Sequence, residues 1–243
     1  MGGRSTAALL ATALVAGLPA AAHAGWRADY RQEFTTTKPG TSTGILTQIL
    51  YKHPDNPEAK PIPLRQEVFT FPVGTRFDGS VVPDCTASDE ELRVQGPSAC
   101  PQESWVGGDD GDTSMTGFPG AGETQTTIDA FDAEGGFRVL GGADQFPLRF
   151  VAHGRREGRT TTVDVPQTPG GLPDGENALR RVNHLFPARS LGRRAYVRTP
   201  SKCPSTGVWV FKLRATFADG AVERFVHRMP CRRKPRRASG SRR

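Results

Sequence analysis

The chain has 243 residues, a formal net charge of +7 and 36% hydrophobic residues, a length that allows one large β-domain or two small ones. Residues 232–243 hold seven Lys and Arg and no Asp or Glu, so residues 25–231 are close to neutral. The excess of positive charge is therefore largely a property of the end of the chain, and it does not indicate a folded domain for specific nucleic-acid recognition.

The first 24 residues have the pattern of an export signal. Arg4 precedes an apolar run over Thr6–Leu18, and Ala22–Ala24 is a small-x-small cleavage site. The apolar run is too short to span a bilayer, and no later stretch is apolar enough to do so. We therefore predict cleavage after Ala24, a secreted mature chain and no membrane span.

From residue 25 onward, short runs of alternating apolar residues are separated by Gly- and Pro-rich turns, which is typical of short strands. The predicted strands before the last 40 residues are 45–51, 64–71, 124–131, 136–140, 148–153, 160–165 and 195–198. Residues 106–123 are rich in Gly and Asp and are predicted to be a flexible surface loop. Asn177–Phe186 fits both helical spacing and alternation, and the neighbouring strands favour a strand.

A long β-hairpin is predicted between Cys203 and Cys231. Residues 208–217 place large apolar side chains at every odd position, and residues 221–229 return after a turn that ends in Gly220. Pro204 and Gly207 are expected to turn Cys203 back toward Cys231.

The hairpin has two possible registers. A two-residue loop would set Phe217 opposite Val222, whereas a three-residue loop sets Leu213 opposite Phe225 and Trp209 opposite Met229. The second register gathers the apolar residues of both strands on one face. Because a slip of one residue would invert every side chain, we predict the three-residue loop.

All four cysteines follow the export signal, so disulfides are expected. Four cysteines permit three pairings. We predict Cys85–Cys100 and Cys203–Cys231, because each pair closes a short local loop that contains Pro and Gly. Zinc is the rival interpretation, but the ligand spacing does not suit it, and no cofactor is expected.

Ser88 followed by Glu91 matches a capping box, which predicts a single helical turn inside the first disulfide loop. Strong helical patterns are otherwise scarce. The sequence therefore predicts an all-β fold, an antiparallel β-sandwich of the jelly-roll or immunoglobulin-like type, as a single domain over residues 25–231 with little helix and two local disulfides.

Several residue groups resemble one protein family when they are taken together. They are Lys60-Pro61, Phe71–Thr75, Asp84–Leu92, Ala99–Pro101 with Ser104, Val106-Gly107, Thr199-Pro200, Cys203-Pro204, Asp219-Gly220 and Pro230-Cys231. The chain is similar over residues 34–231 to a family of uncharacterised exported proteins from high-GC bacteria. This resemblance implies secretion and one compact β-rich unit, and it implies no catalytic residues because no activity accompanies it. The arginine-rich tail is atypical of it.

Catalysis finds little support in the sequence. The chain has no Gly-x-Ser-x-Gly elbow, and His53, His153, His184 and His227 are isolated from one another along the chain. These histidines are interpreted as exposed or half-buried side chains.

Glycoside hydrolysis needs two carboxylates roughly 5–10 Å apart on a rigid cleft. The best local cluster is Asp129, Asp132 and Glu134, which runs into the turn at Gly135. On a strand Asp129 and Asp132 face opposite ways. A secreted carbohydrate-active enzyme working through these residues is therefore kept as the alternative function.

Asp109, Asp110 and Asp112 lie in a glycine-rich stretch and offer the oxygen ligands that calcium takes. The spacing does not complete an EF-hand loop, so these residues are weak calcium candidates. No metal site is predicted.

The basic tail over residues 232–243 is predicted to be disordered. It begins with Arg232, Arg233, Lys234, Arg236 and Arg237. Such a tail can bind an anionic cell-wall polymer through salt-dependent contacts. No aromatic residue is interleaved with it, so base stacking is not expected.

Taken together, the sequence predicts a secreted, non-catalytic β protein that serves as a cell-envelope-associated binding or structural module.

Overall fold

The computed structural model describes residues 26–109, 112–143, 145–146, 148–171 and 173–232. The predicted export signal and residues 233–243 of the basic tail lie outside the described residues. Within these described ranges, no helix is both long and apolar enough to cross a membrane.

Strands dominate the described chain. They are β1 (Ala28–Phe34), β2 (Ile45–Tyr51), β3 (Leu64–Thr70), β4 (Arg76–Phe77), β5 (Trp105–Asp109), β6 (Ser114–Thr116), β7 (Thr124–Gln125), β8 (Thr127–Ala133), β9 (Gly136–Ala143), β10 (Leu148–Glu157), β11 (Thr160–Asp164), β12 (Ala178–Phe186), β13 (Ser190–Leu191), β14 (Arg194–Ala195), β15 (Val197–Arg198), β16 (Val208–Phe217) and β17 (Val222–Pro230). The helical segments are α1 (Asp89–Gln95) and the 3-10 turns η1 (Gly79–Val81), η2 (Gly96–Ala99) and η3 (Gln102–Ser104).

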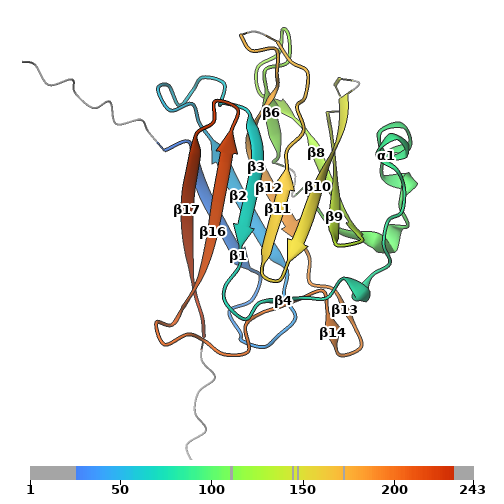
Figure 1. Cartoon of the computed structure of the whole chain (residues 1–243), viewed down its shortest axis with the longest axis vertical. Helices are drawn as coiled ribbons and strands as arrows, with labels where there is room; N and C mark the ends of the chain where they lie inside the picture. Colours follow the sequence, from blue (N-terminus) through green and yellow to red (C-terminus); the bar gives the residue numbers. More distant parts are fainter. Residues whose placement is uncertain (1–25, 110–111, 144, 147, 172, 233–243) are drawn as a thin grey trace, which may run out of the picture.

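Thirteen of the described strands form one large sheet, whose main path runs β1-β2-β12-β5-β8-β9-β10-β11-β3-β16-β17. Each pairing along this path is antiparallel. The sheet curls over, so that β17, β16, β3, β11 and β10 form a layer in front of β1, β2 and β12 (Figure 1). The prediction of an antiparallel all-β fold with little helix is confirmed. The β-sandwich architecture, of the jelly-roll or immunoglobulin-like type, stays a prediction.

The two ends of the main path, β1 and β17, come together at a seam that nearly closes the sheet. Arg27 at the start of β1 contacts Asp219 at 2.8 Å and Glu223 at 3.3 Å, and the backbone N–H of Arg27 also donates to Glu223. Farther along, Nε2 of His227 lies 3.8 Å from a carboxylate oxygen of Glu33. Side chains, rather than a backbone ladder, hold this seam together in the described chain.

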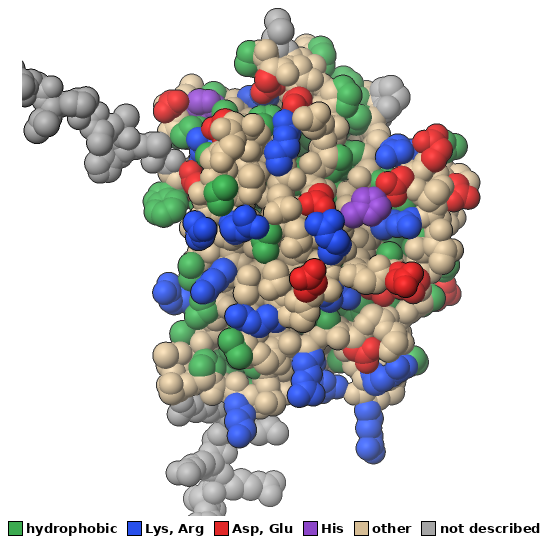
Figure 2. All heavy atoms as spheres, in the orientation of Figure 1, with side chains coloured by type: hydrophobic (Ala, Val, Ile, Leu, Met, Phe, Trp, Pro, Cys, Tyr) green, Lys and Arg blue, Asp and Glu red, His purple; other side chains and the backbone are tan. Residues whose placement is uncertain are grey.

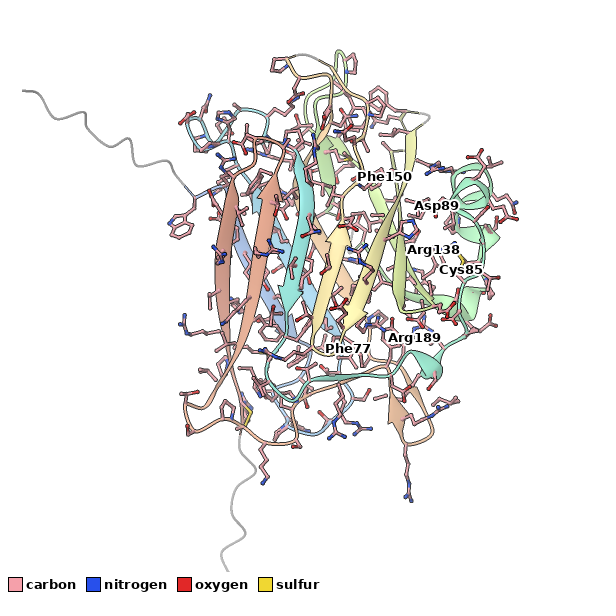
Figure 3. All side chains as sticks on the ribbon, viewed as in Figure 1. Phe77, Cys85, Asp89, Arg138, Phe150 and Arg189 are labelled. Atoms are coloured by element: carbon pink, nitrogen blue, oxygen red, sulfur yellow. A yellow bond between two sulfur atoms is a disulfide. The ribbon has the colours of Figure 1, made fainter. Side chains whose placement is uncertain are left out.

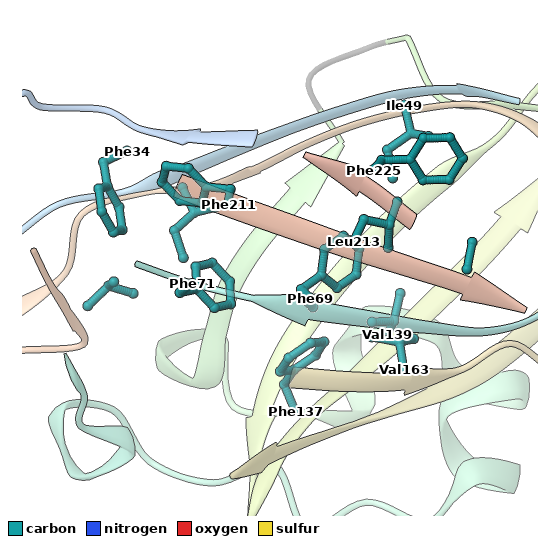
Figure 4. Packing of buried hydrophobic residues seen from close by; sticks show 14 of the residues in the cluster. Phe34, Ile49, Phe69, Phe71, Phe137, Val139, Val163, Phe211, Leu213 and Phe225 are labelled. Carbon is teal, nitrogen blue, oxygen red and sulfur yellow. The ribbon is translucent and has the colours of Figure 1, made fainter. Parts of the chain in front are cut away.

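The core follows from alternation along the strands. Residues at every second position of β2 and β16 are buried, and the largest of them pack aromatic rings against neighbours from β1 and from the end of β3 (Figure 4). The ring of Phe34 lies 5.2 Å from Trp209 and 4.9 Å from Phe211 in edge-on geometry, an arrangement that aromatic quadrupoles favour.

The hairpin of β16 and β17 adopts the three-residue loop. Leu213 pairs with Phe225 and Trp209 with Met229, as predicted. Gly220 has a φ of +83°, which an L side chain rarely adopts, so glycine is required at the end of this turn.

Both predicted disulfides, Cys85–Cys100 and Cys203–Cys231, are present. The chain after Cys203 turns back toward Cys231 as predicted. The N–H of Gly207 donates to the carbonyl of Pro204, and the N–H of Cys231 donates to the carbonyl of Gly207.

Helix α1 begins with the predicted capping box, in which Ser88 and Glu91 bond each other's backbone N–H groups. The helix is longer than the single turn expected. Its buried Leu92 packs on the outer face of the sheet against Phe131, Leu140 and Val151, beside the first disulfide.

The prediction of a flexible loop over residues 106–123 is wrong. This segment contains most of β5 and all of β6, and Val106 is completely buried. Glycine allows β5 and β12 to approach each other closely here, because a Cβ on Gly107 would lie 2.8 Å from the carbonyl oxygen of Leu185. A strand built from glycines lacks the apolar alternation that identifies other strands.

Removal of the second disulfide tests how far it stabilises the hairpin. The link closes 28 residues, so we expect the pair Cys203→Ser and Cys231→Ser to lower the free energy of unfolding by about 2–4 kcal/mol, mainly by freeing the unfolded chain. Urea denaturation of oxidised wild type and variant measures this. A loss below about 1 kcal/mol would contradict the prediction.

Candidate functional site: a cavity inside the sheet

A cavity of about 110 Å³ lies between the two layers of the curled sheet. Most of its wall is apolar, with Phe69, Phe71, Phe137, Val139 and Val163 among the lining residues. Figure 4 shows these side chains within the core. Phe150 and Phe77, two further lining residues, lie toward opposite ends of the sheet (Figure 3).

A row of polar side chains crosses one wall of this cavity. Gln32 on β1 pairs with Thr47 on β2, and Thr47 pairs with His184 on β12, so that the three side chains are neighbours on the inner face. All three are buried and line the cavity. The amide of Gln32 donates to the hydroxyl of Thr47 at 2.9 Å, which satisfies one end of the row.

His184 stands at the other end of the row and is incompletely satisfied. Its side chain is 8% exposed, and Nε2 has no hydrogen-bond partner among the described residues. Burial lowers the pKa of His184 to about 4, against the opposing effects of Asp109 and the backbone of Gly107. The imidazole is therefore neutral at pH 7, with one nitrogen that donates and one that accepts.

Glu67 of β3 adds a buried carboxyl to the cavity wall. The hydroxyl of Tyr51 donates to it, and that hydrogen bond favours the charged form. Burial outweighs this effect and raises the pKa of Glu67 to about 7. Burial, and then the charge of Glu67, raises the pKa of Tyr51 and of Tyr30 above the ordinary tyrosine value.

One end of the cavity is formed by Arg156 and Tyr196, which both line it. Arg156 donates to the hydroxyl of Tyr196 at 2.7 Å, and that hydroxyl donates to Asp132. The guanidinium also lies 5.0 Å from the ring centroid of Phe77, within the range of a cation–π contact. Despite Arg156, burial raises the pKa of Asp132 to about 6.

The structure does not bring the three carboxylates of the glycosidase alternative together. Asp132 is buried beside Tyr196, whereas Asp129 accepts a hydrogen bond at 2.8 Å from the indole of Trp105 on the opposite face of β8. Glu134 is exposed in the turn after β8. Asp129 borders an open depression of about 910 Å³ beside α1, and it is the only carboxylate among the described residues that line this depression.

The calcium candidates are occupied by other contacts. The carboxylate of Asp109 accepts from the hydroxyl of Thr113 at 2.8 Å, and Asp112 forms an ion pair with Arg181 at 2.9 Å. Asp110 lies outside the described residues. Across the described ranges, no group of three or more His, Cys, Asp or Glu is arranged to hold a metal ion.

Among the tail residues only Arg232 is described, and its backbone N–H donates to the carbonyl of Thr37. Arg233, Lys234, Arg236 and Arg237 lie outside the described residues.

Comparisons with protein-family models, with curated proteins and with solved structures find no match. Membership of the exported family described above stays a prediction, and function has to be inferred from the geometry of the site.

The sequence interpretation missed the residues that line the cavity, although a pattern for them exists. Thr47 stands between Ile45 and Ile49, and His184 stands between Val182 and Phe186, at positions where alternation places an apolar residue. A polar residue inside an inward-facing apolar series is the pattern that could have revealed them.

Replacement of Glu67 by Gln tests the state of the buried carboxyl. A glutamate in the unfolded chain loses its proton near pH 4.5, whereas the folded chain retains it until about pH 7. The wild type therefore loses stability as the pH rises through this interval, and the loss is complete above pH 7. Gln resembles the protonated acid and does not titrate. We therefore expect the free energy of unfolding of Glu67→Gln to increase by roughly 3 kcal/mol relative to that of wild type between pH 4.5 and pH 8.

Urea denaturation at both pH values measures this difference. Glu157→Gln, on the exposed end of β10, is the matched control, and its stability relative to wild type should stay constant. If the difference in free energy of unfolding between wild type and Glu67→Gln is the same at both pH values, Glu67 is ionised in the folded protein throughout this range.

Proposed function

We propose that the protein is a secreted, non-catalytic binding protein that encloses a small, mostly apolar molecule with one hydroxyl group inside its sheet. The observation that carries this proposal is the unpartnered Nε2 of His184 on the wall of an otherwise largely apolar cavity. Buried polar atoms without a partner are rare in folded proteins, because desolvation without a hydrogen bond costs about 1–3 kcal/mol. A bound ligand would supply the missing partner.

The size of the cavity limits the ligand. An apolar cavity of about 150 Å³ accommodates benzene, so the smaller volume of 110 Å³ here limits the ligand to at most about one small ring. Contacts with Phe69, Phe137 and Val163 would provide the apolar part of the binding energy, which scales with the area removed from water.

The charge state of the walls limits the ligand further. The pKa of His184 is lowered to about 4 and the pKa of Glu67 is raised to about 7, so both groups favour their uncharged forms near pH 6. An uncharged ligand fits this environment, because a buried ion would need an opposite charge beside it.

Secretion and the absence of catalysis complete the proposal. The two disulfides are consistent with an oxidising compartment. The glycosidase alternative gains no support from the geometry, since Asp129 and Asp132 lie on opposite faces of β8. The cell-envelope association predicted from the sequence remains part of this proposal.

Phenol and toluene form a matched pair of probes, because they have the same shape and differ in one hydroxyl. We expect phenol to bind the mature protein about 3–10-fold more tightly than toluene, since a hydrogen bond to neutral His184 contributes about 0.5–1.5 kcal/mol. Calorimetric titration measures both affinities. His184→Leu should abolish the preference for phenol while toluene still binds.

Two further variants test whether the probes occupy this cavity. Ala152 lines it, so Ala152→Leu should fill the space and abolish binding of both probes. His53→Leu changes a histidine outside the cavity and should retain the preference for phenol. Binding that survives Ala152→Leu, or wild type that binds neither probe, would overturn the proposal.

A further inference from the structure

Four cations lie on the outer face of the β16–β17 hairpin. Lys212 and Arg214 on β16 and Arg224 and Arg228 on β17 occupy even-numbered positions, while the odd-numbered positions of β16 are buried in the core. We refer to these four residues as the basic strip. Figure 2 shows this face of the molecule, with Lys and Arg side chains gathered over β16 and β17.

The basic strip is not neutralised by the protein. None of its four cations forms a salt bridge within the described chain. Other surface arginines on strands have acidic partners, for example Arg155 with Asp164 at 2.7 Å. The contact recorded for a side chain of the strip is a hydrogen bond of 3.3 Å from Arg214 to the neutral Gln66.

Two of the cations directly oppose each other. Arg214 pairs with Arg224 across the two strands, and Cβ atoms in such a pair are about 4.5–5.5 Å apart. Like charges in this position destabilise a sheet. An external anion bound between them would remove the repulsion.

The cations also follow a line along the hairpin. Lys212 lies opposite Val226, so the positions of Arg224, Lys212 and Arg228 are separated by steps of two residues along β17. Each step spans about 7 Å, because an antiparallel strand rises about 3.4 Å per residue. The chain then continues through Cys231 to Arg232, where the basic tail begins.

We propose that the basic strip binds a linear phosphodiester polymer that carries no bases, such as the poly(glycerol phosphate) of a cell envelope. In that polymer six single bonds separate successive phosphorus atoms, the same number that spans two residues of an extended peptide, so its charges also repeat at about 7 Å. One phosphate can therefore meet one cation at each step. This proposal does not depend on the cavity.

Nucleic acid offers a similar backbone spacing, but the strip lacks what its bases would need. The cross-strand neighbours of the cations on this face are Val210 and Val226 of the hairpin and Val68 and Thr70 of β3, and Val226 is 46% exposed. The exposed Trp26 packs instead against Phe225, at an odd-numbered position of β17 that faces away from the strip. Proteins that bind single strands stack bases on aromatic side chains, and aliphatic valine provides no such surface. The strip therefore favours a polymer whose affinity comes from its phosphates alone.

The test compares two variants of the mature chain that lose the same net charge. The strip variant carries Lys212→Gln, Arg214→Gln, Arg224→Gln and Arg228→Gln. The control variant carries Lys38→Gln, Arg76→Gln, Arg193→Gln and Lys202→Gln, which replace four exposed cations outside the hairpin. Fluorescence anisotropy of labelled poly(glycerol phosphate) gives the affinity between 50 and 300 mM NaCl, roughly the range over which phosphate contacts weaken strongly.

We expect the strip variant to bind at least about tenfold more weakly than wild type and to reduce the salt slope by about 2–3, since the strip meets three phosphates and each contact contributes about 0.7–0.9. The control variant should retain most of the affinity. The strip variant should also be at least as stable as wild type, because the opposed Arg214 and Arg224 are gone, and this rules out misfolding as the cause of weaker binding.

Four outcomes would overturn the proposal. The first is equal loss of affinity in both variants, which would indicate that net charge alone acts. The second is a loss of affinity on removal of residues 232–243 that is not seen in the strip variant, which would assign binding to the tail. The third and fourth are tighter binding to a single-stranded DNA 20-mer, or to vesicles of phosphatidylglycerol and phosphatidylcholine, than to the base-free polymer.

Discussion

The enclosed interior depends on the contact between the first and last strands of the sheet. An open sheet of this size would leave the inner faces of β1 and β17 to solvent and two unpaired edges exposed. The contacts of Arg27 with Asp219 and Glu223 bring these edges together. The inward positions of the facing layers therefore lie in one shared interior, and any space that they do not fill becomes a cavity.

The polar groups of that interior share one property. Burial lowers the pKa of His184 and raises the pKa of Glu67, and each shift favours the uncharged form of the side chain. Arg156 differs, because its charge is compensated by Asp132 and by the aromatic faces around it. The interior thus confines charge to one end and leaves hydrogen-bonding groups without charge along its wall.

Local features of the fold were predictable from the sequence. The register of the hairpin follows from which face is apolar, and the capping box and both disulfides involve residues close together in the chain. Strand β5 was missed because Gly107 and Gly108 show no apolar alternation, and their need for glycine comes from neighbours such as Leu185 that are distant in sequence.

The candidate site was less predictable for a related reason. Gln32, Thr47 and His184 become neighbours through the order β1-β2-β12, and no spacing along the chain indicates that β12 lies beside β2. His184 was identified as part of an alternating segment, but its position as an isolated histidine gave no reason to connect it with Thr47. Strand order, not local pattern, assembles the cavity wall.

The number of strands explains why no antiparallel backbone ladder forms at the seam. The main path contains eleven described strands, and each runs opposite to the one before it. Eleven strands give ten such reversals, an even number, so β1 and β17 point the same way and an antiparallel ladder between them is geometrically impossible. Closure by the pattern used elsewhere in the sheet would require a twelfth strand inserted between them, running opposite to both. The parity of the strand order therefore excludes the sheet's usual antiparallel ladder at this junction, where Arg27 and its carboxylate partners make the contact.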